Sequence, residues 1–260
     1  MGSSREQGEL WGRQARDWTE LQEPGHKPLW QAMLESAGVG NGSSVLDVGC
    51  GGGGASILAS AFGARVSGID AAPELVALAA EREPTGEYRV GEMENLPYED
   101  DRFDAVFAAN AVQYAEDRVA AVRELKRVCT PGGRIVAALF GPPEKVEFRA
   151  VFQAVRDAMP EPPPGAGPFE LSAPSVLEGL FQEAGLQVIG TGEVDCPFRY
   201  PNLETFWRAA ASGGPFQGAL GVVGEKKLKA VVEAAVAPFL LEDGSILIQP
   251  NMFRYVVAQV

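Results

Sequence analysis

Short apolar stretches alternate with amphipathic stretches from residue 44 to residue 139, which is the pattern of βαβ units in a parallel sheet. The apolar stretches predict strands at residues 45–48, 65–69, 88–90, 103–108 and 134–139. Between these strands, apolar residues recur at helical spacing and predict helices at residues 55–62, 73–81 and 118–128. The predicted fold class is therefore α/β, a doubly wound Rossmann-like sheet that is mostly parallel.

The pattern changes on both sides of this region. Residues 29–37 predict a helix before the first strand, and the chain after Phe140 is interrupted by prolines, which indicates an insertion or linker outside the core. Beyond the prolines the pattern predicts a helix at 175–184, a strand at 187–194, two helices within 203–240 and an antiparallel last strand at 253–260.

These features divide the chain into six segments. We expect an N-terminal lid and first helix at 1–40, a cofactor-binding core at 41–140, a proline-rich insertion at 141–174, a continuation of the core at 175–195, a helical substrate cap at 196–250 and the last core strand at 251–260.

Composition narrows the possible partners. Lys and Arg number 22 against 35 Asp and Glu, so the net charge is -13, and such a field repels nucleic acid. No apolar run reaches the roughly 20 residues that a membrane helix needs, and we expect a cytoplasmic protein with no membrane partner. Three cysteines and one histidine predict neither disulfides nor a metal site, and the thiols are expected to be reduced.

Residues 45–54 contain a strand that runs into a glycine turn and then a helix. Gly49, Gly51 and Gly54 match the spacing of a dinucleotide-binding loop, and Asp70 follows about 20 residues later, where an acid that binds ribose is expected. Asp47 stands two residues before the first glycine. A carboxylate there would repel a pyrophosphate but would suit a cationic ligand such as a sulfonium or an ammonium.

Further motifs follow in order at residues 68–70, 91–98, 103–106 and 130–133. Together with residues 45–53, they resemble the class I S-adenosylmethionine-dependent methyltransferases, in the branch related to the ubiquinone/menaquinone methyltransferases and their small-molecule relatives. The resemblance covers residues 29–140 and extends more loosely to the remainder. It implies S-adenosyl-L-methionine as the cofactor.

The resemblance also implies roles for individual residues. Gly49 and Gly51 would line the methionine and ribose, Asp70 would accept hydrogen bonds from both ribose hydroxyls, and Asp47 and Asn110 would orient the methionine end. Glu92 and the backbone of Met93 would bracket the adenine, although the family usually has Asp-Ala at these two positions. The expected cofactor-binding residues are Trp18, Asp47, Gly49, Gly51, Asp70, Ala71, Glu92, Met93, Glu94 and Asn110.

The implied reaction is methyl transfer to a small-molecule acceptor, on oxygen, carbon or nitrogen, by in-line displacement. Tyr114, Tyr200 and Trp207 are candidates for contact with the acceptor molecule, although the aromatic residues after residue 196 fit the core of a helical cap equally well. Gln113 and Tyr114 occupy positions where many relatives carry histidine, so a base borrowed from that position is missing.

His26 is the only histidine, in a loop bounded by prolines. It is either a surface residue or a general base, and as a base it would give the rate a pH limb near the ordinary imidazole pKa of about 6.5. Two other functions share the glycine loop: a nicotinamide-dependent oxidoreductase, against which Asp47 and the turn at residues 131–133 argue, and a cofactor-binding protein without catalysis.

Overall fold

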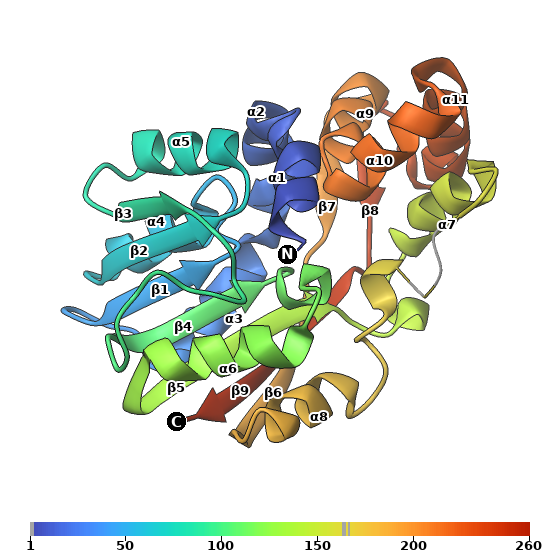
Figure 1. The fold of residues 1–260 in the computed structure, drawn as a ribbon. Coiled ribbons are helices and arrows are strands. Elements are labelled where there is room, and N and C mark those ends of the chain that lie inside the picture. Colours follow the sequence, from blue (N-terminus) through green and yellow to red (C-terminus); the bar gives the residue numbers. More distant parts are fainter. Residues whose placement is uncertain (1–2, 163–164, 166) are drawn as a thin grey trace.

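A seven-stranded sheet forms the centre of the molecule (Figure 1), which we describe from a computed structural model covering residues 3–162, 165 and 167–260. Pro163 and Pro164 of the proline-rich segment lie outside the described residues. The strands of this sheet are β1 (Ser44–Val48), β2 (Arg65–Asp70), β3 (Glu87–Val90), β4 (Phe103–Ala109), β5 (Cys129–Phe140), β6 (Gln187–Asp195) and β9 (Met252–Gln259). Their order is β3-β2-β1-β4-β5-β9-β6, and β9 runs antiparallel to both of its neighbours.

This topology confirms the predicted mostly parallel, doubly wound sheet with an antiparallel last strand. The largest difference in a strand boundary is at β5, which begins at Cys129 instead of residue 134. The turn at residues 131–133 therefore lies within the strand, where the pairing of β4 with β5 shifts its register between Phe103 and Ala105. An irregularity of this kind interrupts the alternating pattern that predicts strands.

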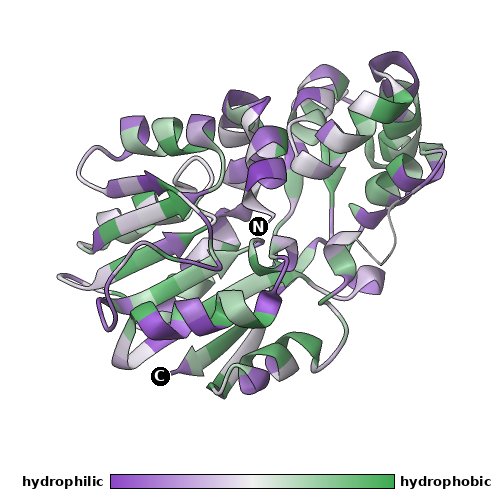
Figure 2. Ribbon diagram, in the orientation of Figure 1, coloured by the Kyte–Doolittle hydropathy of each residue, from purple (hydrophilic) through white to green (hydrophobic). Residues whose placement is uncertain are grey.

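Helices cover both faces of the sheet. On one face lie α3 (Lys27–Ala37) and α4 (Gly54–Ala61), and α5 (Pro73–Arg82) packs on β2 and β3. On the other face lie α6 (Arg118–Val128) and α8 (Val176–Glu183), and in Figure 2 the central strands are mostly green while α6 alternates between purple and green. Because side chains alternate along a strand, Leu46 and Val48 join the α6 side, and Val45 and Asp47 face α3 and α4.

A cap stands beside the carboxyl ends of the parallel strands (Figure 1). It contains α7 (Arg149–Ala158), α9 (Leu203–Ala211), α10 (Gly214–Val223), α11 (Glu225–Val236) and a small sheet of β7 (Phe198–Tyr200) and β8 (Ile246–Ile248). Three helices thus replace the two expected within 203–240, because Gly213 and Gly224 separate them. The small sheet was not predicted.

The prediction that the proline-rich segment lies outside the core is wrong for α7. Phe148, Val151 and Val155 are buried in the same apolar cluster as α11. They form one stripe of a helix that packs on α11, and the surrounding prolines conceal this helical spacing.

The N-terminal segment lies between the core and the cap. It contains α1 (Ser4–Gly12), α2 (Ala15–Asp17), a π-helical turn (Trp18–Gln22) and a 3-10 helix (Glu23–His26), and α1 packs against both α5 and α10. At Gly8 a Cβ atom would lie 2.4 Å from the carbonyl oxygen of Ala71, so only glycine permits this approach. Among the described residues, no helix is both long and apolar enough to cross a membrane.

Candidate functional site

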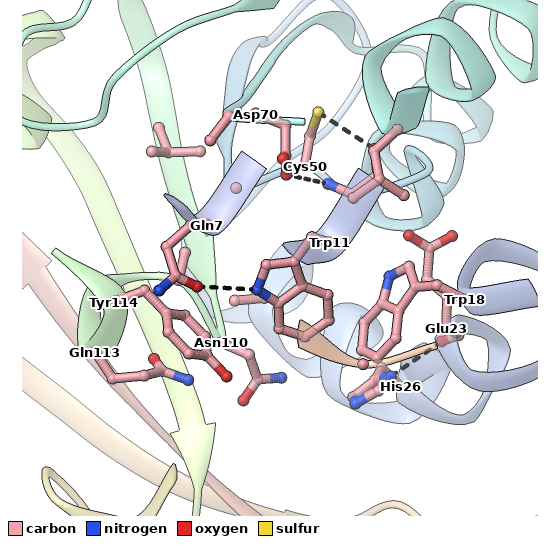
Figure 3. A pocket seen from close by; sticks show the side chains of 18 of the residues that line it. Gln7, Trp11, Trp18, Glu23, His26, Cys50, Asp70, Asn110, Gln113 and Tyr114 are labelled. Carbon is pink, nitrogen blue, oxygen red and sulfur yellow. Dashed lines mark hydrogen bonds between the residues drawn. The ribbon is translucent and has the colours of Figure 1, made fainter. Parts of the chain in front are cut away.

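One cavity lies at the carboxyl ends of β1, β2 and β4, where ligands bind in open α/β sheets (Figure 3). Its wall combines three parts of the chain: the ends of the core strands, the N-terminal segment, and residues of the cap. The sequence prediction of a cofactor site at the glycine loop therefore coincides with a cavity that also extends into the cap.

The glycine loop requires glycine for two separate reasons. Gly49 and Gly51 have φ angles of 72° and 55°, in the left-handed region that side chains rarely adopt. A Cβ atom at Gly51 would also lie 2.7 Å from Glu23 Oε1, and one at Gly49 would lie 2.5 Å from the Cβ of Ala111. The bare backbone thus forms part of the cavity wall.

Asp70 ends β2 and lines the cavity, and two backbone N–H groups hold its carboxylate. Oδ2 accepts a hydrogen bond from the backbone N–H of Gly51 at 2.9 Å, and Oδ1 accepts one from Ala72 at 2.9 Å. Burial raises its pKa, and these hydrogen bonds oppose that rise. Each oxygen keeps a second lone pair, so the carboxylate is fixed in position and still able to accept two ligand hydroxyls.

Asp47 is buried beneath the glycine loop. Ser56 donates its hydroxyl to Oδ2 at 2.9 Å, while burial, together with the nearby charge of Asp70, raises the pKa of Asp47 to about 6. The carboxylate of Asp47 therefore takes up a proton at a higher pH than an ordinary aspartate, and a cation in the cavity would favour its ionised form.

Glu23 is a further carboxylate that the sequence analysis did not select. Its Oε1 accepts from the backbone N–H of Gly52 at 2.7 Å, and its Oε2 forms an ion pair with Arg82 at 2.8 Å. Burial raises its pKa to about 7 despite the contact with Arg82. No local pattern identifies this residue, because only the fold brings the N-terminal segment to the glycine loop.

The loop after β3 forms the opposite wall of the cofactor end. Glu92 and Met93 line the cavity there, and Glu92 Oε2 accepts a hydrogen bond at 3.1 Å from the backbone N–H of Ser4 in α1. Ala71, which directly follows β2, also lines the cavity. Glu94 was expected beside them, but it is not part of the wall. Its Oε1 accepts from the backbone N–H of Glu116 at 2.6 Å, so its carboxylate secures the start of the segment that leads into α6.

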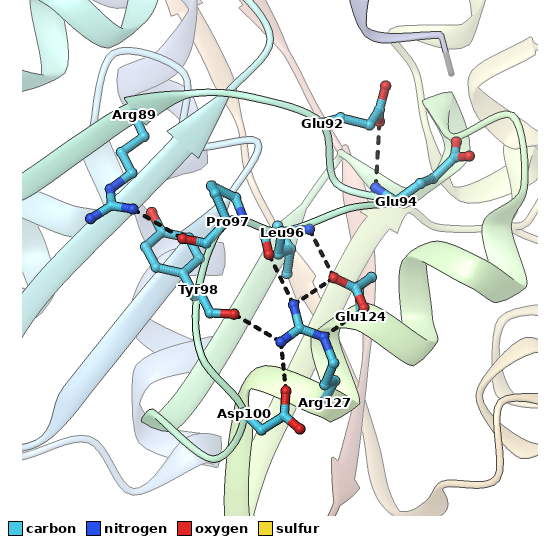
Figure 4. A network of polar contacts seen from close by, with 9 residues as sticks. All are labelled: Arg89, Glu92, Glu94, Leu96, Pro97, Tyr98, Asp100, Glu124 and Arg127. Atoms are coloured by element: carbon cyan, nitrogen blue, oxygen red, sulfur yellow. Dashed lines mark hydrogen bonds and ion pairs between the residues drawn. The ribbon is translucent and has the colours of Figure 1, made fainter. Parts of the chain in front are cut away.

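Arg127 holds this loop in place (Figure 4). Its guanidinium donates to the carbonyl oxygens of Leu96 at 2.9 Å and Tyr98 at 2.8 Å, and it pairs with Glu124 and Asp100, each at 2.7 Å. Glu124 also accepts from the backbone N–H of Leu96 at 2.8 Å. A loop of irregular backbone is therefore fixed by α6, which positions Glu92 and Met93.

Three polar residues that follow β4 line the cavity: Asn110, Gln113 and Tyr114. Asn110 has a φ angle of 53°, a strained backbone for a side-chain-bearing residue. The side-chain oxygens of Asn110 and Gln113 are buried without a hydrogen-bond partner among the described residues. Buried polar atoms usually have partners, so these two oxygens indicate a place where a ligand binds.

Trp18 lines the cavity, as expected for the N-terminal lid. Its ring meets Trp11 edge-to-face at a centroid distance of 4.6 Å, and Trp11 meets Tyr114 at 5.7 Å. The two indoles therefore cover the cavity between the glycine loop and the end of β4 (Figure 3).

His26 lies in the cavity wall within a 3-10 helix, so both the predicted loop and the surface location are wrong. Its side chain is buried among four aromatic rings, those of Trp18, Trp30, Phe198 and Phe253, with centroids at 5.2 to 6.3 Å. Nδ1 lies 3.2 Å from the carbonyl oxygen of Glu23. Burial lowers the pKa of His26 to about 4, so the imidazole is neutral near pH 7.

Tyr200 and Trp207, which were expected to contact the acceptor molecule, are buried but do not line the cavity. The hydroxyl of Tyr200 donates to Gln22 Oε1 at 2.6 Å, behind the wall that Gln22 itself forms. The cap end of the cavity is instead lined by phenylalanines from β5, from the residue that precedes α7, from α7 itself and from α10. They are Phe140, Phe148, Phe152 and Phe216.

No group of three or more His, Cys, Asp or Glu side chains in the described part of the chain is arranged to hold a metal ion. Cys50, Cys129 and Cys196 are buried free thiols.

The comparisons with known proteins agree with the motifs. Residues 46–137 match the family model described as a methyltransferase domain, which confirms the resemblance to methyltransferases. An uncharacterized protein of Mycobacterium tuberculosis is 41% identical over 123 residues, which is 46% of this chain and 45% of the relative. A malonyl-[acyl-carrier protein] O-methyltransferase of Erwinia pyrifoliae is 32% identical over 149 residues, which is 57% of this chain and 56% of the relative.

The chain thus spans about half the length of these curated relatives. Among solved structures, the [4+2]-cyclase SpnF superposes with a TM-score of 0.59 at 21% identity, over 89% of this chain and 80% of that one. This likeness establishes the fold alone, and because the neighbour is a cyclase, the shared fold does not determine the activity.

Proposed function

We propose that this chain, whose residues 46–137 are a methyltransferase domain, transfers a methyl group from S-adenosyl-L-methionine to a small-molecule acceptor. The observation that carries the proposal is the arrangement of Asp47, Asp70 and the bare backbone of Gly49 and Gly51 around one end of a cavity whose other end is apolar. A cofactor and an acceptor would meet between these two ends.

The residues of the site fit this cofactor chemically. Gly51 leaves space that a side chain would fill, and the buried oxygen of Asn110 lacks a partner among the described residues. The acids Glu23, Asp47 and Asp70 are suited to a ligand that carries a sulfonium, an ammonium and two ribose hydroxyls. Glu92 and Met93 would hold the adenine end, and Trp18 would cover the cofactor.

The cofactor supplies an activated methyl group on a positively charged sulfur, so the protein chiefly has to bind, align and desolvate the reactants. The glycine loop and Asp70 would fix the position of the cofactor. Trp11, Trp18 and the phenylalanines of the cap would exclude water and hold the acceptor in line with the bond that breaks. His26 is the proposed proton acceptor where the acceptor atom carries an acidic proton.

Calorimetry in the presence of EDTA tests the proposal. We expect saturable binding of both S-adenosylmethionine and S-adenosylhomocysteine without metal. The absence of any binding heat at millimolar cofactor, from protein shown to be folded by circular dichroism, would refute it. Turnover is then sought by mass spectrometry with methyl-labelled cofactor and a panel of phenols, quinols, amines and sterols.

The net charge of -13 supports a small-molecule partner over nucleic acid, and we propose a cytoplasmic location. Three buried free thiols support that location, because reduced cysteines are typical of the cytoplasm.

A further inference from the structure

The two ends of the cavity differ in charge. The acidic side chains in the wall are Glu23, Asp47, Asp70 and Glu92, and all four lie at the glycine loop or at the loop after β3. No lysine or arginine lines the cavity within the part of the chain that the structure describes. An acceptor with a carboxylate or a phosphate would therefore lose its hydration without gaining a cationic partner, which is costly.

The cap end offers aromatic contact instead. Phe140 and Phe152 meet edge-to-face at a centroid distance of 5.6 Å, and Phe152 lies 5.7 Å from Phe216. Phe148 lies 5.0 Å from Phe152. Such a wall favours an uncharged ligand that is largely apolar or aromatic.

His26 adds a directed polar contact to this environment. The carbonyl oxygen of Glu23 can only accept a hydrogen bond, so Nδ1 of His26 carries the proton in the neutral ring. Nε2 is then an unprotonated acceptor. The backbone of Gln22 also lies close to the imidazole. The hydrogen bond that the described structure gives the ring is that of Nδ1, so Nε2, on a side chain that lines the cavity, is left for a ligand.

The aromatic rings connect His26 to the cap end. The imidazole lies 5.2 Å from Phe253, which lies 4.4 Å from Phe140, and 5.5 Å from Phe198, which lies 5.3 Å from Phe148. Nε2 therefore belongs to the same apolar environment as the phenylalanines, where a hydrogen bond is stronger than in water.

We propose that the acceptor is an uncharged aromatic molecule whose hydroxyl group donates a hydrogen bond to His26 Nε2 and is methylated on its oxygen. This inference rests on the proposed methyl transfer. A hydroxyl gains more from such a partner than a neutral amine does, because the hydroxyl proton has to leave during the reaction, whereas a neutral amine needs little more than alignment.

The transfer step balances with the groups present. A lone pair of the hydroxyl oxygen forms the new bond to the methyl carbon, and the bond between that carbon and sulfur breaks with its electron pair remaining on sulfur. The hydroxyl proton passes to Nε2 of His26. The positive charge thus moves from the sulfonium to the imidazolium, which releases the proton to solvent when the product leaves.

Binding of three related probes tests this inference without requiring turnover. Calorimetry on protein saturated with S-adenosylhomocysteine compares 2-naphthol with its methyl ether, 2-methoxynaphthalene, and with 2-naphthoate. We expect 2-naphthol to bind about tenfold more tightly than the ether, because it alone donates a hydrogen bond, and at least tenfold more tightly than the carboxylate.

Variants separate the hydrogen bond from apolar packing. His26→Phe should abolish the advantage of 2-naphthol over the ether and leave binding of the ether within about threefold, whereas Phe152→Ala should weaken both probes equally. His26→Gln keeps a polar group near Nε2, and it should retain part of the advantage while losing turnover.

The inference is overturned if wild-type protein binds 2-naphthoate as tightly as 2-naphthol, if it binds no naphthol at millimolar concentration, or if His26→Phe keeps the full advantage. The wild-type comparison decides the matter even if His26→Phe does not fold. Protein that shows the expected order of probes without cofactor, but binds neither S-adenosylmethionine nor S-adenosylhomocysteine, would refute the methyl-transfer proposal and leave the aromatic pocket standing.

Discussion

The cofactor end and the cap end of the cavity are built in different ways. At the cofactor end, Asp47, Gly49, Gly51 and Asp70 lie at the ends of two adjacent strands, and backbone N–H groups hold the carboxylate of Asp70 directly. At the cap end, the rings come from segments as far apart in sequence as Phe140 and Phe216, and ring packing holds them. Directed hydrogen bonds therefore fix the cofactor end, whereas the packing of aromatic rings determines the size and shape of the cap end. Substitutions at the two ends should accordingly affect the binding of cofactor and the binding of acceptor separately.

The largest effect that separates the two ends is expected at His26. His26→Gln should lower kcat on a hydroxyl acceptor by about 10²–10⁴-fold, the usual contribution of a positioned base, and should leave cofactor affinity nearly unchanged. Steady-state kinetics and calorimetry on the same preparation measure the two effects. If the variant retained more than about a third of the wild-type kcat, a barrier change of under about 0.7 kcal/mol, alignment alone would account for the rate.

The pH profile sharpens this prediction. Because burial lowers the pKa of His26 to about 4, the imidazole is already deprotonated between about pH 6 and 8, and wild-type kcat should show no limb near 6.5 from this residue. This corrects the expectation based on the ordinary pKa. A limb near 6.5 that His26→Gln removed would mean that His26 is more exposed in the working enzyme.

The second largest effect is expected at Asp70. Asp70→Ala removes a carboxylate that would accept two ribose hydroxyls, and hydrogen bonds to a charged group contribute about 1.5–3 kcal/mol. Cofactor affinity should fall by about ten- to a hundredfold in calorimetry. Glu81→Ala, which changes an exposed acid of α5 in the same domain, is the matched control and should leave affinity unchanged. An unchanged affinity in Asp70→Ala would place the ribose elsewhere.

A smaller effect is expected from the buried carboxylates. Burial raises the pKa of Glu23 to about 7 and that of Asp47 to about 6, so both hold protons in part of the neutral range when the cavity carries no cation. Glu23 faces Arg82 and the loop N–H of Gly52, and Asp47 faces Ser56 and Asp70. A sulfonium and an ammonium favour the ionised forms, so binding should release protons.

Affinity for S-adenosylmethionine should therefore rise, by about tenfold, as pH increases from about 5 to 8. The rise should be smaller for S-adenosylhomocysteine, whose sulfur is uncharged. Calorimetry in buffers of different ionisation heats measures the protons released. Glu23→Gln should remove the increase in affinity near pH 7 and keep the increase near pH 6. If the dependence of affinity on pH were the same in this variant as in the wild type, a group other than Glu23 would be responsible for the increase near pH 7.

The two ends also differ in how far the sequence predicts them. The glycine loop, Asp47 and Asp70 could be predicted because glycines with positive φ and an acid at a strand end leave a fixed spacing in the chain. Phe148 and Phe152 could not be assigned to the cavity, because the surrounding prolines obscured α7 and only the packing of α7 on α11 determines where its rings point. Glu23 was not selected and the burial of His26 was not predicted for a similar reason, because only the fold places the N-terminal segment beside the glycine loop.

The smallest effect is expected at Tyr200, which was predicted to contact the acceptor but lies behind the wall. Tyr200→Phe removes only the buried hydroxyl that donates to Gln22, and a hydrogen bond of this kind contributes about 0.5–1.5 kcal/mol to stability. The melting temperature should therefore drop by a few degrees, while cofactor affinity and the preference among acceptors stay within about threefold of wild type. Phe216→Ala, a substitution in the wall itself, should instead raise the KM of the acceptor by about tenfold with cofactor affinity intact. If Tyr200→Phe changed acceptor preference as strongly as Phe216→Ala, the Tyr200 hydroxyl would act on the ligand through Gln22. Tyr200 would then have to be counted as part of the acceptor site and not as part of the core of the cap.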